Sequence, residues 1–253
     1  MDSTQRFSSR VENYVKYRPS YPQEIIAALQ QACGLTSDSV VADVGSGTGI
    51  FAELLLRNGN TVYGIEPNQA MRAAGDQLLQ HYPRFHSVNG TAENTTLPDK
   101  SVDFITAGQA FHWFDLDKAR QVFARILKPG GWVALVWNER RSDSTPFLRD
   151  YEQLLRAYGT DYEASRHTNF DAAIIRAFFA PNPMFMQTFE NQQRFDYEGL
   201  RGRLLSSSYT PEPGDPCHAP MLAELQRIFD RHAANGTVVF EYDTVLYYGQ
   251  LED

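Results

Sequence analysis

The chain has 253 residues with a formal net charge of −8, and 42% of the residues are hydrophobic. This length accommodates one large α/β domain, or a core domain that carries an inserted cap, and we expect the second. The acidic balance argues against general affinity for nucleic acid or anionic membranes, because both depend on a cationic surface. No apolar run reaches the roughly 18 to 20 residues that span a bilayer, and residues 1–10 lack a signal-peptide pattern. We therefore expect a cytoplasmic protein with no membrane or nucleic-acid partner.

Metal and disulfide chemistry is not indicated. Cys33 and Cys217 are too few for a disulfide framework and lack CxxC spacing. His81 and His86 lie on either side of Pro83, and no HExxH pattern occurs. We predict two reduced thiols and no metal ion.

Strands and helices alternate over the first 138 residues. A helix with apolar residues at helical spacing is predicted first, followed by a short β-branched strand, a glycine loop and a second helix. This alternation predicts right-handed βαβ crossovers and a doubly wound, mostly parallel sheet with helices on both faces. The expected helices are 22–32, 50–57, 70–79 and 118–127, and the expected strands are 39–44, 61–65, 85–88, 102–106 and 132–137.

The pattern changes after residue 138. We predict helices at 146–158 and 221–234, and strands at 184–195 and 238–248, with Pro181 and Pro183 interrupting the chain. The two further strands bring the predicted sheet to seven. We divide the chain into an N-terminal lid with the first helix (1–37), a cofactor-binding core (38–138), a cap or substrate region (139–236) and a final strand that returns to the sheet (237–253).

The glycine loop after the first strand has the sequence Gly45-Ser46-Gly47-Thr48-Gly49. In an open α/β sheet, ligands bind beyond the carboxyl ends of the strands, where this loop lies. A phosphate-binding P-loop requires GxxxxGK, and a dinucleotide fingerprint requires a glycine at the sixth place. Ile50 occupies that place, which disfavours both ligand classes and therefore an NAD-dependent oxidoreductase.

The GxGxG spacing after Asp43 resembles motif I of the class I S-adenosylmethionine-dependent methyltransferases. The resemblance continues through Gly64-Ile65-Glu66-Pro67-Asn68, Gly90-Thr91-Ala92-Glu93 with Leu97-Pro98, and Leu127-Lys128-Pro129-Gly130-Gly131, and covers about residues 38 to 138. Each motif is weak alone, but together and in this order they are specific. The resemblance implies a Rossmann-like fold, S-adenosylmethionine as cofactor and methyl transfer as the reaction.

The resemblance also assigns cofactor-binding residues. Glu66 is expected on the ribose, since a carboxylate accepts two hydrogen bonds from vicinal hydroxyls. Asp43 is expected to act on the ammonium group, directly or through water, or only to orient the loop. Met71 and Ala92 would flank the adenine, with a core packing role as the alternative for Met71, and Glu93 would accept from the adenine amino group. The full predicted set is Asp43, Gly45, Ser46, Gly47, Gly49, Glu66, Pro67, Met71, Ala92, Glu93 and Gln109, with Tyr17 and Arg18 from the N-terminal lid.

The substrate side is indicated by the segment after the fourth strand. Nucleic-acid amino methyltransferases have an Asn- or Asp-Pro-Pro-aromatic motif there, whereas this chain has His112-Trp113-Phe114-Asp115. This variant resembles a small-molecule subgroup that includes the trans-aconitate methyltransferases, which esterify a carboxylate. Residues 7–22 resemble that subgroup's lid, and 206–209 resemble part of its cap.

His112 is the predicted catalytic residue. It is compatible with three roles: anchoring a carboxylate as imidazolium, acting as a base, or capping the following helix. The residues predicted to bind the acceptor are His112, Trp113, Tyr14, Arg140 and Tyr209.

We expect O-methylation of a carboxylate or hydroxyl on a small molecule. C-methylation of a quinone-like ring, which would require a wider apolar cap, and a cofactor-binding module without turnover remain open alternatives. The acceptor molecule, its reacting atom and the oligomeric state are not decided at this stage.

Overall fold

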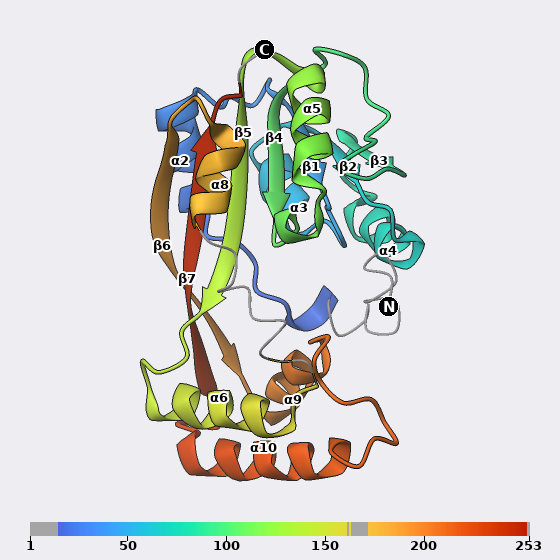
Figure 1. Cartoon of the computed structure of the whole chain (residues 1–253). Helices are drawn as coiled ribbons and strands as arrows, with labels where there is room; N and C mark the ends of the chain where they lie inside the picture. Colours follow the sequence, from blue (N-terminus) through green and yellow to red (C-terminus); the bar gives the residue numbers. More distant parts are fainter. Residues whose placement is uncertain (1–14, 161, 163–171, 252–253) are drawn as a thin grey trace.

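The computed structural model describes residues 15–160, 162 and 172–251. Its centre is a seven-stranded sheet in the order β3-β2-β1-β4-β5-β7-β6, in which the first five strands are parallel and β7 runs antiparallel to both β5 and β6 (Figure 1). This confirms the predicted fold class. The strands are β1 (Val40–Val44), β2 (Thr61–Ile65), β3 (Phe85–Val88), β4 (Val102–Gly108), β5 (Leu127–Arg140), β6 (Met184–Phe195) and β7 (Val238–Gly249).

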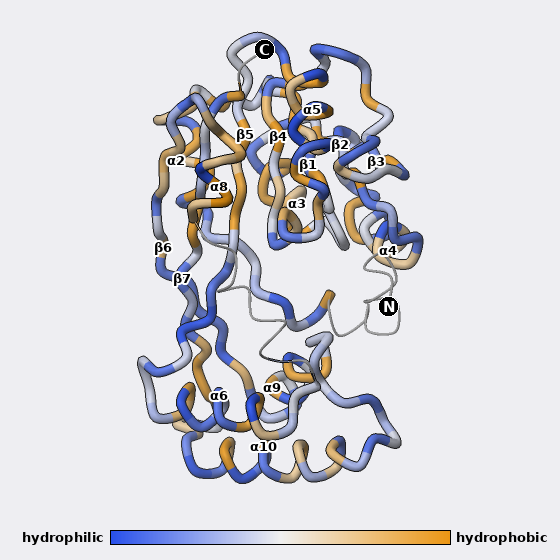
Figure 2. The backbone as a smooth tube through the Cα atoms, viewed as in Figure 1, coloured by the Kyte–Doolittle hydropathy of each residue, from blue (hydrophilic) through white to orange (hydrophobic). Residues whose placement is uncertain are grey.

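Helices cover both faces of the sheet. Alternate residues of a strand point to opposite faces, so Val41 and Phe104 pack with α2 and α3, whereas Ala42 and Ile105 pack with α5 and α8. Figure 2 shows hydrophobic stretches along β4, β5 and α8. The core helices are α2 (Glu24–Cys33), α3 (Ile50–Arg57), α4 (Gln69–Leu79), α5 (Leu116–Ile126) and α8 (Ala172–Phe179).

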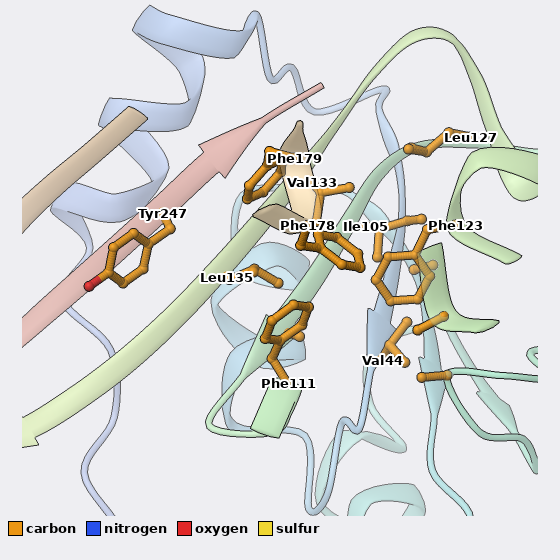
Figure 3. Packing of buried hydrophobic residues seen from close by; sticks show 14 of the residues in the cluster. Val44, Ile105, Phe111, Phe123, Leu127, Val133, Leu135, Phe178, Phe179 and Tyr247 are labelled. Atoms are coloured by element: carbon orange, nitrogen blue, oxygen red, sulfur yellow. The ribbon is translucent and has the colours of Figure 1, made fainter. Parts of the chain in front are cut away.

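Aromatic rings fill the face covered by α5 and α8. The ring of Phe111 packs edge-on against Phe178 with a centroid separation of 4.8 Å, and the ring of Phe123 packs edge-on against Phe178 at 6.0 Å (Figure 3). Edge-to-face pairs at such separations are favourable beyond their buried area. This packing holds the segment after β4 against the sheet.

A second region lies beyond the carboxyl ends of the parallel strands (Figure 1). Its helices α6 (Pro146–Tyr158), α9 (Tyr197–Leu205) and α10 (His218–His232) enclose a separate hydrophobic core that includes Leu155, Leu204 and Leu225. Phe240 of β7 belongs to that core, whereas Leu246 of the same strand packs in the main domain. One continuous β6–β7 ladder therefore joins this cap to the sheet.

Several predicted bounds differ from the structure. β5 begins at Leu127, which pairs with Val102 before a register shift, and it extends to Arg140, which pairs with Tyr242 of β7. The predicted strand 132–137 was too short for two reasons. Gly130 and Gly131 favour a turn, and the sequence does not show that β7 pairs with the end of β5. Helices α8 and α9 were not predicted, since α8 has only eight residues and α9 contains two glycines, which disfavour helix. α8 and the first part of β6 fall within 139–236, yet they pack in the main domain, whereas Phe195 at the end of β6 belongs to the core of the cap.

Part of the predicted lid, with Tyr14, lies outside the described residues. None of the helices in the described ranges has both the length and the apolar character needed to cross a bilayer.

Candidate active site

A pocket lies at the carboxyl ends of β1, β2 and β4, where the glycine loop follows β1. Its lining comes from four segments: the glycine loop, the start of α4, the loop after β3, and the segment between β4 and α5. The lining residues are Gly45, Gly47, Glu66, Pro67, Asn68, Met71, Thr91, Ala92, Glu93, Gly108, Gln109, Ala110, Trp113 and Phe114.

The glycine loop has a backbone that only glycine adopts readily. Gly45 has φ 69° and Gly49 has φ 86°. A Cβ on Gly45 would lie 2.5 Å from Ala110 Cβ, and one on Gly49 would lie 2.5 Å from Leu79 Cδ1. The loop is therefore in close contact with the segment after β4 on one side and with α4 on the other.

The amides of this loop are used within the protein. The N–H groups of Gly45 and Ser46 donate to Ile65 O at 2.8 and 3.1 Å, and that of Gly49 donates to Ser46 O at 2.8 Å. The N–H of Gly47 donates to Glu66 Oε2 at 2.9 Å. A phosphate cradle needs free N–H groups that point at the ligand, so this loop is not organised to hold a phosphate.

Glu66 follows β2 and closes the loop from the opposite side. Its Oε2 accepts from Gly47 N, and its Oε1 accepts from Asn68 N at 2.8 Å. Each carboxylate oxygen can accept two hydrogen bonds, so each retains a position for a hydroxyl donor in the pocket. Burial raises the pKa of Glu66, although both backbone donors oppose that rise.

Asp43 lies behind the loop, at the end of β1, and does not line the pocket. Its Oδ1 accepts from Thr106 Oγ1 of β4 at 2.8 Å. Its Oδ2 is buried and has no hydrogen-bond partner among the residues that the structure describes. Burial raises the pKa of Asp43 to about 7, and the neighbouring Glu66 contributes to the rise. A cationic group at the loop would favour the ionised form of this carboxyl.

The opposite wall of the pocket is apolar apart from one carboxylate. Met71 of α4 is buried and contacts the loop at Gly47, and Ala92 is buried beside it. Glu93 Oε1 accepts from Asp115 N at 2.8 Å, which ties this wall to the start of α5. Such a slot suits a flat aromatic ring with a polar edge.

Gln109 and Trp113 bound the pocket on the side of the cap. Gln109 has φ 55°, an uncommon conformation for a residue other than glycine. Its Nε2 donates to Asn138 O at 3.2 Å, whereas its Oε1 is buried without a partner in the described part of the chain. Trp113 is 41% exposed. An exposed indole in a pocket wall is available to contact a ligand.

His112 does not line the pocket. Its ring packs against Trp113 with a centroid separation of 4.7 Å. The helix-capping role considered for it is wrong, because Asp115 is the N-cap of α5 and accepts from Lys118 N. Asp115 directly precedes the helix, and its short side chain reaches the first free amides, whereas His112 lies three residues earlier.

The predicted residues thus fall into three groups. Those in the lining are Gly45, Gly47, Glu66, Pro67, Met71, Ala92, Glu93, Gln109 and Trp113. Asp43, Ser46, Gly49 and His112 are close to the lining in sequence but are not part of it. Tyr17, Arg18, Arg140 and Tyr209 face the cap instead: Tyr17 packs on Gly202 of α9, and Arg18 Nη2 donates to Ser206 O at 2.9 Å.

Some lining residues were not predicted, namely Asn68, Thr91, Gly108, Ala110 and Phe114. Asn68 had a usable signal, because an asparagine just before a helical segment predicts an N-cap. It accepts from Ala70 N and Met71 N, and so aims the start of α4 at the pocket. Ala110 had none, since only tertiary contact with Gly45 brings it there.

Comparisons with known proteins agree with this geometry. Residues 42–135 match the family model for a methyltransferase domain. A methyltransferase of Mycobacterium tuberculosis, described as uncharacterized, is 39% identical over 139 residues, which are 55% of this chain and 54% of the relative. One of Geobacillus sp. is 33% identical over 158 residues, 58% of this chain and 68% of the relative. The chain belongs to the class I S-adenosylmethionine-dependent methyltransferases.

Solved structures support the fold of this methyltransferase. A proposed type II methyltransferase of Anaeromyxobacter dehalogenans has a TM-score of 0.71 at 22% identity, with coverage of 94% of this chain and 100% of the other. A phosphoethanolamine N-methyltransferase of Haemonchus contortus, solved with S-adenosylhomocysteine, has a TM-score of 0.56 at 15% identity, with coverage of 100% and 59%. The chain matches about half the length of the mycobacterial relative.

The first prediction concerns Glu66. Glu66→Ala removes both remaining acceptor positions, so we expect binding of S-adenosylhomocysteine to weaken by roughly 1.5 to 3 kcal/mol, as for hydrogen bonds to a charged group. Calorimetry on the purified variant measures this. Glu53→Ala is the matched control, because Glu53 pairs with Arg57 on the surface of α3 and lies outside the lining. If both variants and the wild type bind S-adenosylhomocysteine with equal affinity, Glu66 does not contact the cofactor.

The second prediction concerns the pH dependence of stability. The pKa of Asp43 is higher in the folded protein, about 7, than its ordinary value of 3.8, so between these values the folded state binds the extra proton. The free energy of unfolding therefore falls as pH rises from about 4 to 7. In Asp43→Asn we expect this contribution, on the order of 3 kcal/mol, to be absent. Denaturant unfolding without cofactor at pH 4, 6 and 8 tests this, and parallel curves for both proteins would contradict it.

Proposed function

We propose that this protein transfers a methyl group from S-adenosylmethionine to a small-molecule acceptor, with O-methylation of a carboxylate or hydroxyl favoured. The observation that carries the proposal is the charge of the pocket. Among the described residues that line it, Glu66 and Glu93 are carboxylates and none is lysine or arginine. Together with a loop in which four amides already donate within the protein, this favours a cationic ligand with hydroxyl groups over a pyrophosphate.

The residues present fit that cofactor. We assign Glu66 to the ribose hydroxyls, and the wall of Met71 and Ala92 to the adenine, with Glu93 at its amino edge. The glycine loop would face the methionyl end. The buried Oδ2 of Asp43 lies behind this loop with an unused acceptor position, which supports a contact with the ammonium group through water or an indirect role in orienting the loop.

The protein's part in the reaction is alignment and exclusion of water. The bound cofactor supplies an electrophilic methyl group, which a nucleophile attacks in line with the departing sulfur. Tyr21 lies against Gly108: a Cβ added to Gly108 would lie 2.5 Å from Tyr21 Oη. Tyr21 and Trp113 therefore border the side of the pocket from which an acceptor would approach.

The geometry favours an acceptor that needs no base. A carboxylate is ionised at pH 7, whereas a hydroxyl usually requires proton removal. His112 does not line the pocket, so its position supports a role in holding Trp113 rather than direct contact with the reacting atom. The expected cytoplasmic location stays a prediction.

Labelled methyl transfer tests the proposal. The protein is incubated with S-adenosylmethionine labelled in the methyl group and with panels of carboxylic acids, phenols, quinones and amines. We expect label in a carboxylic acid or hydroxyl compound. Label in a quinone ring would replace O-methylation by C-methylation. Micromolar cofactor binding with no transfer across the panels would favour a binding module without turnover, and binding of NADH alone would contradict the cofactor.

The third prediction separates the roles of His112. A general base contributes about 10² to 10⁴-fold, so we expect His112→Gln to lower turnover by less than this, with unchanged cofactor affinity. The reason is that, in our proposal, His112 holds Trp113 in place and takes no proton from the acceptor. Steady-state kinetics from pH 6 to 9 provide the measurement, with exposed His81→Gln as control. A larger loss that recovers at high pH would instead show that His112 is a base.

A further inference from the structure

Three arginines from separate segments of the chain surround Tyr209 in the cap. Arg18 precedes α2, Arg140 ends β5 and Arg203 lies on α9. Burial acts to raise the pKa of Tyr209, yet this pKa lies below its usual value because of Arg203, Arg140, a hydrogen bond with Ser207, and Arg18. The ring of Tyr209 packs on Tyr162 at 4.9 Å, and Tyr162 Oη accepts from Arg140. The name arginine cluster is used below for Arg18, Arg140, Arg203 and Tyr209.

The charge of Arg203 is buried, and it has no anionic partner among the residues that the structure describes. Its side chain has 6% relative exposure. It donates to neutral oxygens only: Ser207 Oγ at 3.1 Å, Tyr242 Oη at 3.4 Å and Ser206 Oγ at 3.5 Å. Within the described ranges, no carboxylate forms an ion pair with it. Burying an unpaired charge is costly, and buried charges are normally paired.

Arg140 is only partly compensated. Its Nη2 contacts Glu152 and donates to Tyr162 Oη at 3.0 Å. Glu152 is shared, because its other oxygen accepts from Arg156 at 3.1 Å. Arg140 Nη1 is buried and has no hydrogen-bond partner among the residues described. Glu152 therefore divides its charge between Arg140 and Arg156, and it forms no ion pair with Arg203 in the described part of the chain.

The arginine cluster is connected to the cofactor pocket by short links. Asn138 lies two residues before Arg140 on β5; its carbonyl accepts from Gln109 of the pocket lining. Its Nδ2 donates to Ser20 O at 3.3 Å. Ser20 lies between Arg18, which reaches the cap at Ser206, and Tyr21, which lies against Gly108 of the lining. Asn138 and the segment 18–21 thus link the cluster to the pocket lining.

We propose that the arginine cluster binds an oxyanion of the methyl acceptor, a carboxylate or a phosphate, at a position remote from the atom that is methylated. Guanidinium groups pair bidentately with such planar or tetrahedral anions, and the anion would neutralise the excess of buried positive charge. This inference rests on the proposed function and narrows its substrate class to small molecules that keep a negative charge after methylation.

The test measures anion binding in the full chain with S-adenosylhomocysteine bound. The probes are propane-1,2,3-tricarboxylate and inorganic phosphate, titrated by calorimetry against sodium chloride of equal ionic strength. We expect saturable binding of at least one probe, weakened by about tenfold or more in Arg140→Gln and in Arg203→Gln. The tighter of the two probes shows whether the anion is a carboxylate or a phosphate.

The control variant is Arg227→Gln, because Arg227 is exposed on α10 and pairs only locally with Glu224. Its anion affinity should equal that of wild type. Arg140→Lys keeps the charge but not the planar fork, and we expect it to weaken binding as well. Thermal unfolding shows whether each variant folds. If Arg203→Gln does not fold, Arg140→Lys still tests the proposal.

Two failures are distinguishable. Absence of S-adenosylhomocysteine binding in wild type would overturn the proposed function. Normal cofactor binding with no saturable anion binding, or with equal anion affinity in wild type, Arg140→Gln and Arg140→Lys, would overturn the anion site and leave the proposed function standing.

Discussion

The carboxylate of Glu66 links the ends of β1 and β2, because it accepts hydrogen bonds from the amides of Gly47 and Asn68. The arrangement of the pocket depends on this link. It uses an amide that would otherwise attract a phosphate, and it directs the remaining acceptor positions into the pocket. Asn68, held by the same carboxylate, caps α4 and thereby places Met71 in the opposite wall.

Burial gives the two acids of the site different properties. Glu66 has two backbone donors and an opening to the pocket, whereas Asp43 has one hydroxyl donor and a second oxygen without a partner in the described chain. Desolvation by burial raises the pKa of Asp43 to about 7, against the opposing effect of the hydrogen bond from Thr106. The buried carboxyl of Asp43 behind the loop favours a cationic ligand, because a nearby positive charge offsets the cost of desolvating the ionised carboxylate.

The long ladder between β6 and β7 determines how the cap relates to the core. Its register is continuous from Met184 and Gly249 at one end to Phe195 and Val238 at the other, so the cap is built on the same sheet as the cofactor site. Because β5 also extends to Arg140 along this ladder, a residue of the core sheet enters the cap. In our proposal, the acceptor side of the site is therefore formed by core and cap together.

The sequence by itself determined the alternating elements of the core and the glycine loop with Glu66, because these depend on local periodicity and on motifs of adjacent residues. Helix 50–57 and strands 61–65 and 85–88 have the predicted bounds. Only the tertiary structure decided the length of β5, the place of Ala110 against Gly45, and the grouping of Arg18, Arg140 and Arg203 around Tyr209. Those features join residues that are far apart in the chain, and the desolvation that gives buried charges their properties exists only after the segments have packed.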